Sequence, residues 1–226
     1  MSEADGLGPE WRRLLEVERR LQSIVEGTIL VGGAAAAIHA GHRLSVDGDH
    51  VLPDLRERFD QVVASLEAEP GWRTSRLRRP VLVLGEPSGV RTGIRQLRRS
   101  RPLETEIREG IRLPTLGEMA RVKAWLLIER DTTRDYVDTV VLLERLGSDQ
   151  LTRAFRDFDA IYERGPGGEP PLTELVSDLA EGRPADRESV DLGSYKGLRP
   201  PWTDWSYVLE RGRHWAGLLA RLELTP

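Results

Sequence analysis

The sequence predicts an α+β fold, with a mixed sheet and flanking helices over residues 1–113 and a C-terminal helical bundle over residues 114–226. Up to residue 113, short apolar segments are separated by glycine and proline, a pattern typical of strands joined by turns. After Pro114, apolar residues recur at intervals of three and four over long stretches, which predicts helices. A chain of 226 residues is long enough for two such domains.

The elements of the first domain follow from apolar spacing and from the residues that interrupt it. Pro53 stands where a helix begins and Gly71 where it ends, since proline fits the first helical turn and glycine the position after the last. The expected elements, in order, are a helix over 9–26, a strand over 28–31, a helix over 34–40, a strand over 44–49, a helix over 53–70, and strands over 72–79, 81–85, 90–97 and 105–113.

The second domain is expected to be helical. Thr115 and Glu118 have the spacing of a capping box, which predicts a helix start, and Gly147 ends the second helix. Residues 164–171 and 182–201 are rich in glycine and proline, so we expect irregular structure there. The expected helices run from Thr115 onward and then over 132–146, 149–162, 171–181 and 202–222.

Composition limits the function classes. The formal net charge is −4, which argues against indiscriminate nucleic-acid binding, and the lack of cysteine excludes disulfides and thiolate metal sites. No apolar run approaches the roughly 20 residues of a membrane helix. Residues 1–6 are acidic and have no apolar core, so no signal peptide is expected. These features favour a cytoplasmic protein that does not bind membranes.

Positive charge is concentrated in one stretch of the first domain. Between residues 73 and 101 there are nine arginines and a single acid, Glu86. Because arginine suits bidentate phosphate contacts, this stretch is either a surface that faces an RNA acceptor or an ordinary solvated edge. The arginines are Arg73, Arg76, Arg78, Arg79, Arg91, Arg95, Arg98, Arg99 and Arg101.

Asp47 and Asp49 are the leading candidates for a metal site. Residues two apart on a strand point to the same face of a sheet, so both carboxylates would aim at one point in space. Two like charges held that close need a cation, and hard oxygen ligands select Mg²⁺ or Mn²⁺. The alternative is a solvated turn, in which Gly48 supplies the bend.

Gly32 and Gly33 stand where the expected strand meets a short helix. Such a junction presents free backbone N–H groups and the positive end of a helix dipole, which together favour phosphate. Arg43 and Ser45 lie between these glycines and Asp47 in one strand–helix–strand unit, so they are candidate phosphate ligands.

A second set of charged residues lies on two expected helices of the second domain. Lys123 is surrounded by apolar residues and is either a snorkelling surface lysine or a cation aimed at triphosphate oxygens. Arg130 follows two turns later and shares its face. Asp135 and Asp138 are helical neighbours that either bind a nearby arginine or accept a proton from an attacking hydroxyl.

Together these segments resemble the AbiEii/AbiGii abortive-infection nucleotidyltransferase toxin family, within the DNA polymerase-beta-like nucleotidyltransferase superfamily. Residues 32–49 resemble the first motif of the family, and residues 110–116 resemble the second, a glycine followed by an apolar–proline step. Residues 123–130 and 134–138 resemble the third and fourth. The four segments occur in the family's order and cover roughly half of the chain.

The resemblance implies a polymerase-beta-like mixed sheet and a metal-dependent transfer of a nucleoside monophosphate from NTP to an acceptor. The acceptor would be RNA, such as a tRNA 3′ end, or a protein, and a paired antitoxin is a usual partner. Asp47 and Asp49 would hold Mg²⁺ or Mn²⁺ as cofactor, while Gly32, Gly33 and Lys123 would bind phosphate oxygens.

Two other functions stay open. Superfamily members usually add a third carboxylate from a later strand, and residues 90–97 contain none, although Glu104 and Glu106 follow. That lack favours a member that binds nucleotide or RNA without catalysis. The third possibility is a protein whose helical half docks a partner through aromatic anchors. These anchors would be Trp202, Trp205 and Trp215.

Overall fold

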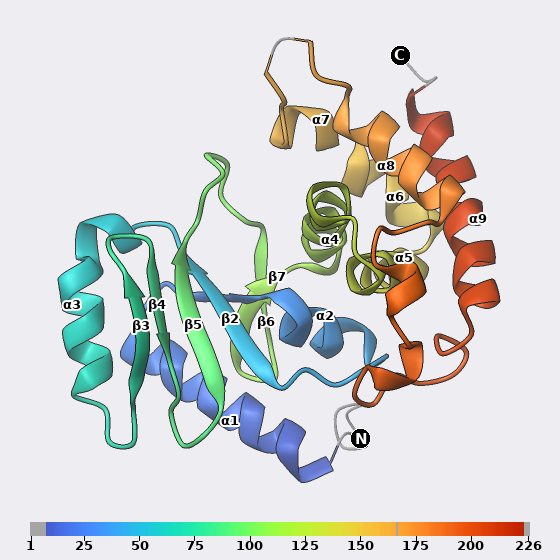
Figure 1. The fold of residues 1–226 in the computed structure, drawn as a ribbon. Coiled ribbons are helices and arrows are strands. Elements are labelled where there is room, and N and C mark those ends of the chain that lie inside the picture. Colours follow the sequence, from blue (N-terminus) through green and yellow to red (C-terminus); the bar gives the residue numbers. More distant parts are fainter. Residues whose placement is uncertain (1–7, 166, 224–226) are drawn as a thin grey trace. The chain divides into compact units, whose positions relative to one another are not determined.

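Five strands near the N-terminal end form a mixed sheet in the order β1–β2–β5–β4–β3 (Figure 1). The structure, a computed structural model, describes residues 8–165 and 167–223 and divides into two units, one up to Thr115 and one from Leu116. The acidic segment 1–6 lies outside the described residues. The strands are β1 (Ile29–Val31), β2 (Asp47–Leu52), β3 (Thr74–Arg78), β4 (Leu82–Gly85) and β5 (Arg91–Gln96).

Strands β2 and β5 are parallel, whereas the other three pairs of the sheet are antiparallel. A parallel pair needs a long crossover, and here residues 53–90 supply it with a helix and the β3–β4 hairpin. In this register Asp47 lies opposite Arg91 and Asp49 lies opposite Gly93. The crossover therefore brings the arginine-rich segment beside the aspartates.

Two helices, α1 (Gly8–Ile24) and α3 (Leu55–Glu67), cover one face of this sheet (Figure 1). Every second residue of β2 is buried, so His50 and Leu52 point to the helices while Asp47 and Asp49 point to the other face. Burying one such apolar side chain contributes about 1.5–3 kcal/mol. The core contains Leu21, Val25, Leu52, Leu55, Phe59, Val62, Leu66, Val83 and Ile94.

The rest of the first unit is a short helix, α2 (Gly32–Ala40), and a separate two-stranded sheet. The prediction of one strand over 105–113 is wrong, because this segment forms a hairpin of β6 (Thr105–Arg108) and β7 (Ile111–Pro114). The two residues between them, Glu109 and Gly110, both have positive φ, at 52° and 71°. A two-residue hairpin turn needs that geometry, and the sequence Glu-Gly predicts such a turn more weakly than Asn-Gly does.

The second unit is helical, as expected from its apolar spacing. The expected helix over 149–162 is interrupted at Arg156 and Asp157, so that part of the prediction is corrected. The helices are α4 (Leu116–Arg130), α5 (Thr133–Leu146), α6 (Ser148–Phe155), α7 (Phe158–Ile161), α8 (Pro171–Glu181) and α9 (Trp205–Glu223). Among the described residues, no helix has the length and apolar character needed to cross a membrane.

Candidate functional site

Asp47 and Asp49 stand side by side on the face of the sheet that α1 and α3 leave uncovered. The strand begins at Asp47 rather than at residue 44, yet it holds both aspartates at the expected spacing of two. The prediction of same-face carboxylates is thus confirmed, and the reading of Asp-Gly-Asp as a turn is wrong. Their side chains are 44% and 45% exposed, so both remain accessible to a ligand.

Gly32 and Gly33 open α2 beside Asp49. Val31 precedes the helix and provides no side-chain cap, so the first backbone N–H groups of α2 have no capping oxygen from it. Gly32 has φ of +69°, and a Cβ at this position would lie 3.2 Å from Asp49 Oδ2. The first glycine therefore allows the helix start to approach the carboxylate closely.

Arg43 and Ser45 converge on Gly33. A Cβ built on Gly33 would lie 2.8 Å from Arg43 Nη2 and 3.1 Å from Ser45 Oγ. The Ser45 hydroxyl also donates a hydrogen bond of 3.0 Å to the backbone carbonyl of Asp47, which connects this group to β2. The structure thus brings Gly32, Gly33, Arg43, Ser45, Asp47 and Asp49 together around one end of α2.

Arginines of the adjacent strand contact both aspartates. Arg91 Nε lies 3.0 Å from Asp47 Oδ1, and its Nη2 donates to Asp47 Oδ2 over 3.1 Å. Arg95 Nε lies 3.6 Å from Asp49 Oδ1. The sequence placed these arginines only in a basic stretch, because the pairing of β2 with β5 could not be read from it.

The strand that would supply a third carboxylate places Gly93 opposite Asp49. A Cβ at Gly93 would overlap the end of the Leu84 side chain of β4, so a carboxylate there would require Leu84 to move. Glu106, which the sequence offered as another source of a third carboxylate, lies on β6. Its Oε1 is 3.1 Å from Arg108 Nε.

Behind the aspartates, the helix-covered face of β2 carries a buried polar cluster. Thr92 donates a hydrogen bond of 3.2 Å to Glu18 of α1, and His50 Nδ1 lies 3.4 Å from the same carboxyl. Burial raises the pKa of Glu18 to about 8; the Thr92 hydrogen bond opposes this shift and the charge of Asp49 adds to it. Burial also lowers the pKa of His50 to about 3.

Glu18 was missed by the sequence reasoning, although a signal was present. It falls on the apolar stripe of α1 between Leu14 and Leu21, at helical spacing. A carboxylate on the buried face of a helix is expected only where a polar partner meets it.

Lys123 lies in a buried ion cluster of the second unit. Its Nζ is 2.7 Å from Asp135 Oδ1 and 2.7 Å from Asp138 Oδ2, and all three side chains are at most 4% exposed. Thr132 caps α5, and its hydroxyl lies 3.0 Å from Asp135 Oδ2. Arg130 is 59% exposed, with Nη1 at 3.8 Å from Asp135 Oδ2. Four predicted site residues thus meet here, with Lys123 as the main partner of both aspartates.

A divalent metal fits the first group of residues. Among the described residues no cluster of three or more His, Asp or Glu side chains is arranged as a metal site. Mg²⁺ is commonly held by only one or two carboxylates, with water and substrate phosphate oxygens completing its shell. Two accessible carboxylates beside a helix N-terminus provide that kind of donor set.

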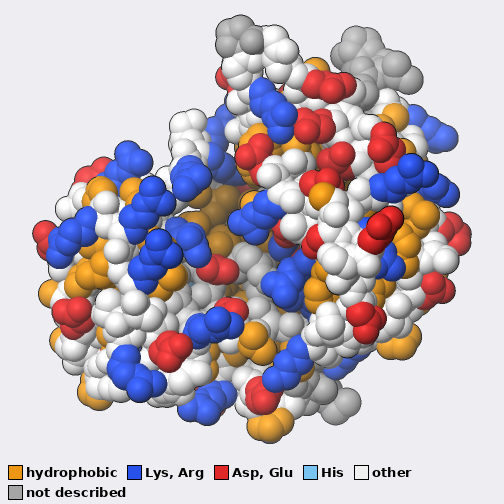
Figure 2. All heavy atoms as spheres, viewed as in Figure 1, with side chains coloured by type: hydrophobic (Ala, Val, Ile, Leu, Met, Phe, Trp, Pro, Cys, Tyr) orange, Lys and Arg blue, Asp and Glu red, His pale blue; other side chains and the backbone are white. Residues whose placement is uncertain are grey.

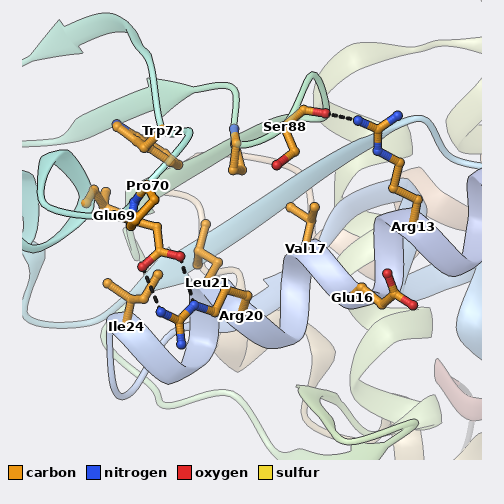
Figure 3. A pocket seen from close by; sticks show the side chains of 12 residues that line it. Arg13, Glu16, Val17, Arg20, Leu21, Ile24, Glu69, Pro70, Trp72 and Ser88 are labelled. Carbon is orange, nitrogen blue, oxygen red and sulfur yellow. Dashed lines mark hydrogen bonds and ion pairs between the residues drawn. The ribbon is translucent and has the colours of Figure 1, made fainter.

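A cavity of about 410 Å³ lies elsewhere in the first unit (Figure 3). Its walls come from α1, from the turn after α3 and from the loop at Ser88. Arg20 and Glu69 form a bidentate ion pair at its rim, with both hydrogen bonds at 2.9 Å. Neither Asp47 nor Asp49 lines it. The candidate site around Asp47 and Asp49 is therefore separate from this cavity.

Comparison with solved structures identifies the fold. JHP933 from Helicobacter pylori superposes with a TM-score of 0.59 at 15% identity, over 96% of this chain and 95% of that one. A proposed nucleotidyltransferase from the same organism gives the same score and identity. The antibiotic-resistance factor ANT(2'')-Ia, in complex with adenylyl-2''-tobramycin, gives 0.50 at 14% identity over 66% of this chain and 99% of that one. The chain thus has the mixed α+β fold of nucleotidyltransferases.

Sequence comparison adds little. No family model matches the chain. The heme uptake protein MmpL11 of Mycobacterium tuberculosis (strain ATCC 25618 / H37Rv) is 28% identical over 95 residues, or 39% of this chain. The mycolic acid-containing lipids exporter MmpL11 of Mycolicibacterium smegmatis is 29% identical over 102 residues, or 45% of this chain. The chain spans about a tenth of the length of these relatives.

Proposed function

We propose that this chain is a metal-dependent nucleotidyltransferase that moves a nucleoside monophosphate from NTP to an acceptor hydroxyl. One observation carries the proposal: on a nucleotidyltransferase fold, the Gly-Gly start of α2 and the Asp47–Asp49 pair meet on the same face of the sheet. Phosphate-binding N–H groups and metal-binding carboxylates are the two components that such a reaction requires.

The reaction assigns a role to each residue around α2. An acceptor oxygen attacks the α-phosphorus of NTP, a new P–O bond forms, and the bond to the β-phosphate oxygen breaks, so pyrophosphate leaves. The α2 N–H groups at Gly32 and Gly33, with Arg43 and Ser45, would hold phosphate oxygens. Asp47 and Asp49 would hold Mg²⁺ or Mn²⁺, which supplies charge neutralisation and a more acidic attacking hydroxyl.

The proposal keeps the charged group of the second unit, which consists of Lys123, Arg130, Asp135 and Asp138, but its most accessible cation is now Arg130. The Lys123 ammonium is neutralised by two carboxylates inside the second unit. Contact of Lys123 with triphosphate oxygens and proton acceptance by either aspartate stay predictions. Arg130, which is exposed, is the member of this group most accessible to a phosphate.

The acceptor class follows from charge. Arginines of β3 and β5 lie on the same face of the sheet as Asp47 and Asp49, by the strand register. Figure 2 shows Lys and Arg side chains gathered over these strands. An RNA acceptor such as tRNA is negatively charged and therefore suits this surface better than a neutral acceptor does. A protein acceptor or an antitoxin would need acidic residues to bind here. We further propose the toxin role on the family resemblance.

A binding protein without catalysis is the second candidate, because β5 carries no carboxylate and places Gly93 opposite Asp49. Docking of a partner through tryptophans has less support. Trp215 is 3% exposed and donates a hydrogen bond to Glu144, and Trp205 packs against Tyr136 at 5.1 Å between ring centroids.

The test is transfer of label from each α-³²P NTP to total RNA or protein, with Mg²⁺ or Mn²⁺. We expect labelled RNA with the unchanged chain, and a loss of at least about 10²-fold in rate with Asp47→Asn or Asp49→Asn. Asp60→Asn, on the exposed outer side of α3, is the matched control and should keep full activity. Triphosphate binding without any labelled product would select the binding protein instead.

A further inference from the structure

The two candidate metal ligands each have an arginine partner on β5. Arg91 approaches Asp47 with two nitrogens, and Arg95 approaches Asp49 with Nε. The register explains the pattern, because Arg91 and Arg95 are four residues apart and point to the same face, on either side of Gly93. Both arginine side chains are more than half exposed, at 68% and 52%.

These ion pairs are easily exchanged. Exposed pairs contribute little to stability, since water competes for both charges. Two carboxylates and two guanidinium groups sum to zero charge, so a divalent cation alone finds little net attraction here. A metal–triphosphate complex differs, because its own negative oxygens can take up both guanidinium groups while the metal takes the carboxylates.

We propose that Arg91 and Arg95 exchange partners on substrate binding, from Asp47 and Asp49 to the triphosphate oxygens, so that the site takes up metal and triphosphate together and metal alone only weakly. This inference rests on the proposed function in taking the two aspartates as the metal ligands of a nucleotide. It does not require that transfer to an acceptor occurs.

The exchange predicts effects of opposite sign on two affinities in one double variant. Arg91→Gln with Arg95→Gln removes the competing cations, so Mn²⁺ alone should bind more tightly. The same variant loses two phosphate contacts, so tripolyphosphate with Mn²⁺ should bind more weakly. Lost contacts of this charge-assisted kind correspond to about tenfold or more in affinity. A purely structural role for the arginines would shift both affinities in one direction or neither.

A matched control is available on the neighbouring strand. Arg76 of β3 is exposed and lies on the same face, since it pairs with Leu84, which pairs with Gly93. Arg76→Gln removes one positive charge from this face without touching the aspartates. It should leave the affinities for Mn²⁺ and for Mn²⁺–tripolyphosphate near those of the unchanged chain.

The experiment is calorimetric titration of the full chain with MnCl₂, and then with tripolyphosphate in excess Mn²⁺. Tripolyphosphate is used because it reports the phosphate subsite independently of the nucleobase. The double variant Arg91→Lys with Arg95→Lys keeps the charge. It should leave the affinity for Mn²⁺ unchanged and lower the affinity for tripolyphosphate. This lysine pair also guards against a folding defect in the glutamine pair.

The exchange is overturned if the glutamine pair leaves Mn²⁺ affinity unchanged or lowers it, or if tripolyphosphate binds as before. Failure of the proposed function gives a different pattern. In that case Asp49→Asn abolishes Mn²⁺–tripolyphosphate binding and the opposite-sign effects persist, but no acceptor becomes labelled.

Discussion

The carboxyl group of Glu18 lies directly against Gly48, so a methyl group added to this glycine would overlap it. Gly48 is the residue between the two aspartates on β2, and Glu18 comes from α1 on the helix-covered face. The glycine is therefore needed for close packing within a strand and not for a bend. The helix thus constrains the strand that carries both candidate metal ligands.

This contact predicts that Gly48→Ala destabilises the first unit. The added methyl must displace a fully buried carboxyl, and overpacking of this kind costs about 1–3 kcal/mol. Urea unfolding followed by circular dichroism measures the loss. Glu18→Ala in the same chain should recover part of the stability, because it frees the space. Equal losses from Gly48→Ala with and without Glu18→Ala would show that the two residues do not compete for space.

The raised pKa of Glu18 predicts that stability falls as the pH rises from about 6.5 to 8. The folded pKa of about 8 lies above the ordinary glutamate pKa of 4.5, so between these values the folded chain binds more protons than the unfolded chain. Stability from this group is therefore present at low pH and lost as pH rises toward 8. Below pH 6.5, His50 has the opposite effect on stability. Its pKa in the folded chain is lowered to about 3, so at these pH values it binds a proton only in the unfolded chain.

The measurement is the urea midpoint at pH 6.5 and 8. We expect a decrease on the order of 1–2 kcal/mol in the unfolding free energy, since one pH unit corresponds to about 1.4 kcal/mol per proton. Glu18→Gln keeps the side-chain shape but does not titrate, so its decrease should be smaller by that amount. If the unfolding free energy of Glu18→Gln falls between pH 6.5 and 8 by as much as that of the unchanged chain, Glu18 is not the source of the pH dependence.

The buried cluster predicts that Lys123→Ala lowers stability as well as any activity. Removing the ammonium leaves Asp135 and Asp138 buried without their shared partner, a change that typically costs about 3–5 kcal/mol. A solvated lysine would cost almost nothing. Arg130→Ala is the matched control on the same helix, and its exposed side chain predicts a change within about 0.5 kcal/mol.

A rescue variant separates stability from function in this cluster. Lys123→Met combined with Asp135→Asn and Asp138→Asn removes the uncompensated charge, so thermal unfolding should return toward that of the unchanged chain. If this rescued chain binds Mn²⁺–tripolyphosphate normally, Lys123 has a structural role only. Weakened binding in a stable chain would support a phosphate contact.

The arginines of β3 and β5, which share a face of the sheet with Asp47 and Asp49, predict salt-dependent RNA binding. Each neutralised phosphate releases counterions, so the logarithm of tRNA affinity should fall linearly with the logarithm of salt concentration. Arg76→Gln with Arg78→Gln removes two exposed charges from β3 and should reduce the slope by about 1–2. Arg20→Gln, on α1 and paired with Glu69, is the control. Fluorescence anisotropy of labelled tRNA between about 50 and 200 mM salt gives both slopes. A slope that is unchanged in the β3 variant would leave these arginines as solvated surface.

Several features could be read from the sequence because they depend on neighbours along the chain. The spacing of two between Asp47 and Asp49 fixes a shared face on any strand, and the Gly-Gly step marks the start of a short helix. Pro171 and Gly182 bound α8 where their backbone preferences predict. The hairpin at residues 109–110 was missed because Glu-Gly gives only a weak turn signal.

Partners distant in sequence could not be predicted in the same way. Arg91 meets Asp47 only because residues 53–90 return the chain to a parallel position beside β2. Glu18 meets Gly48 only because α1 packs across the sheet, and Lys123 meets Asp138 because α4 and α5 pack together. Strand register and helix packing depend on the whole set of buried surfaces.

The sequence by itself determined the two-part α+β organisation, the paired carboxylates and the helix start beside them, since all three follow from local periodicity and backbone preference. Only the tertiary structure decided the electrostatic state of those groups. It placed arginines on Asp47 and Asp49, a leucine over Gly93 and two carboxylates around Lys123. Charge and burial are properties of the folded surroundings, because Coulomb and desolvation energies depend on distance in space and not on distance along the chain.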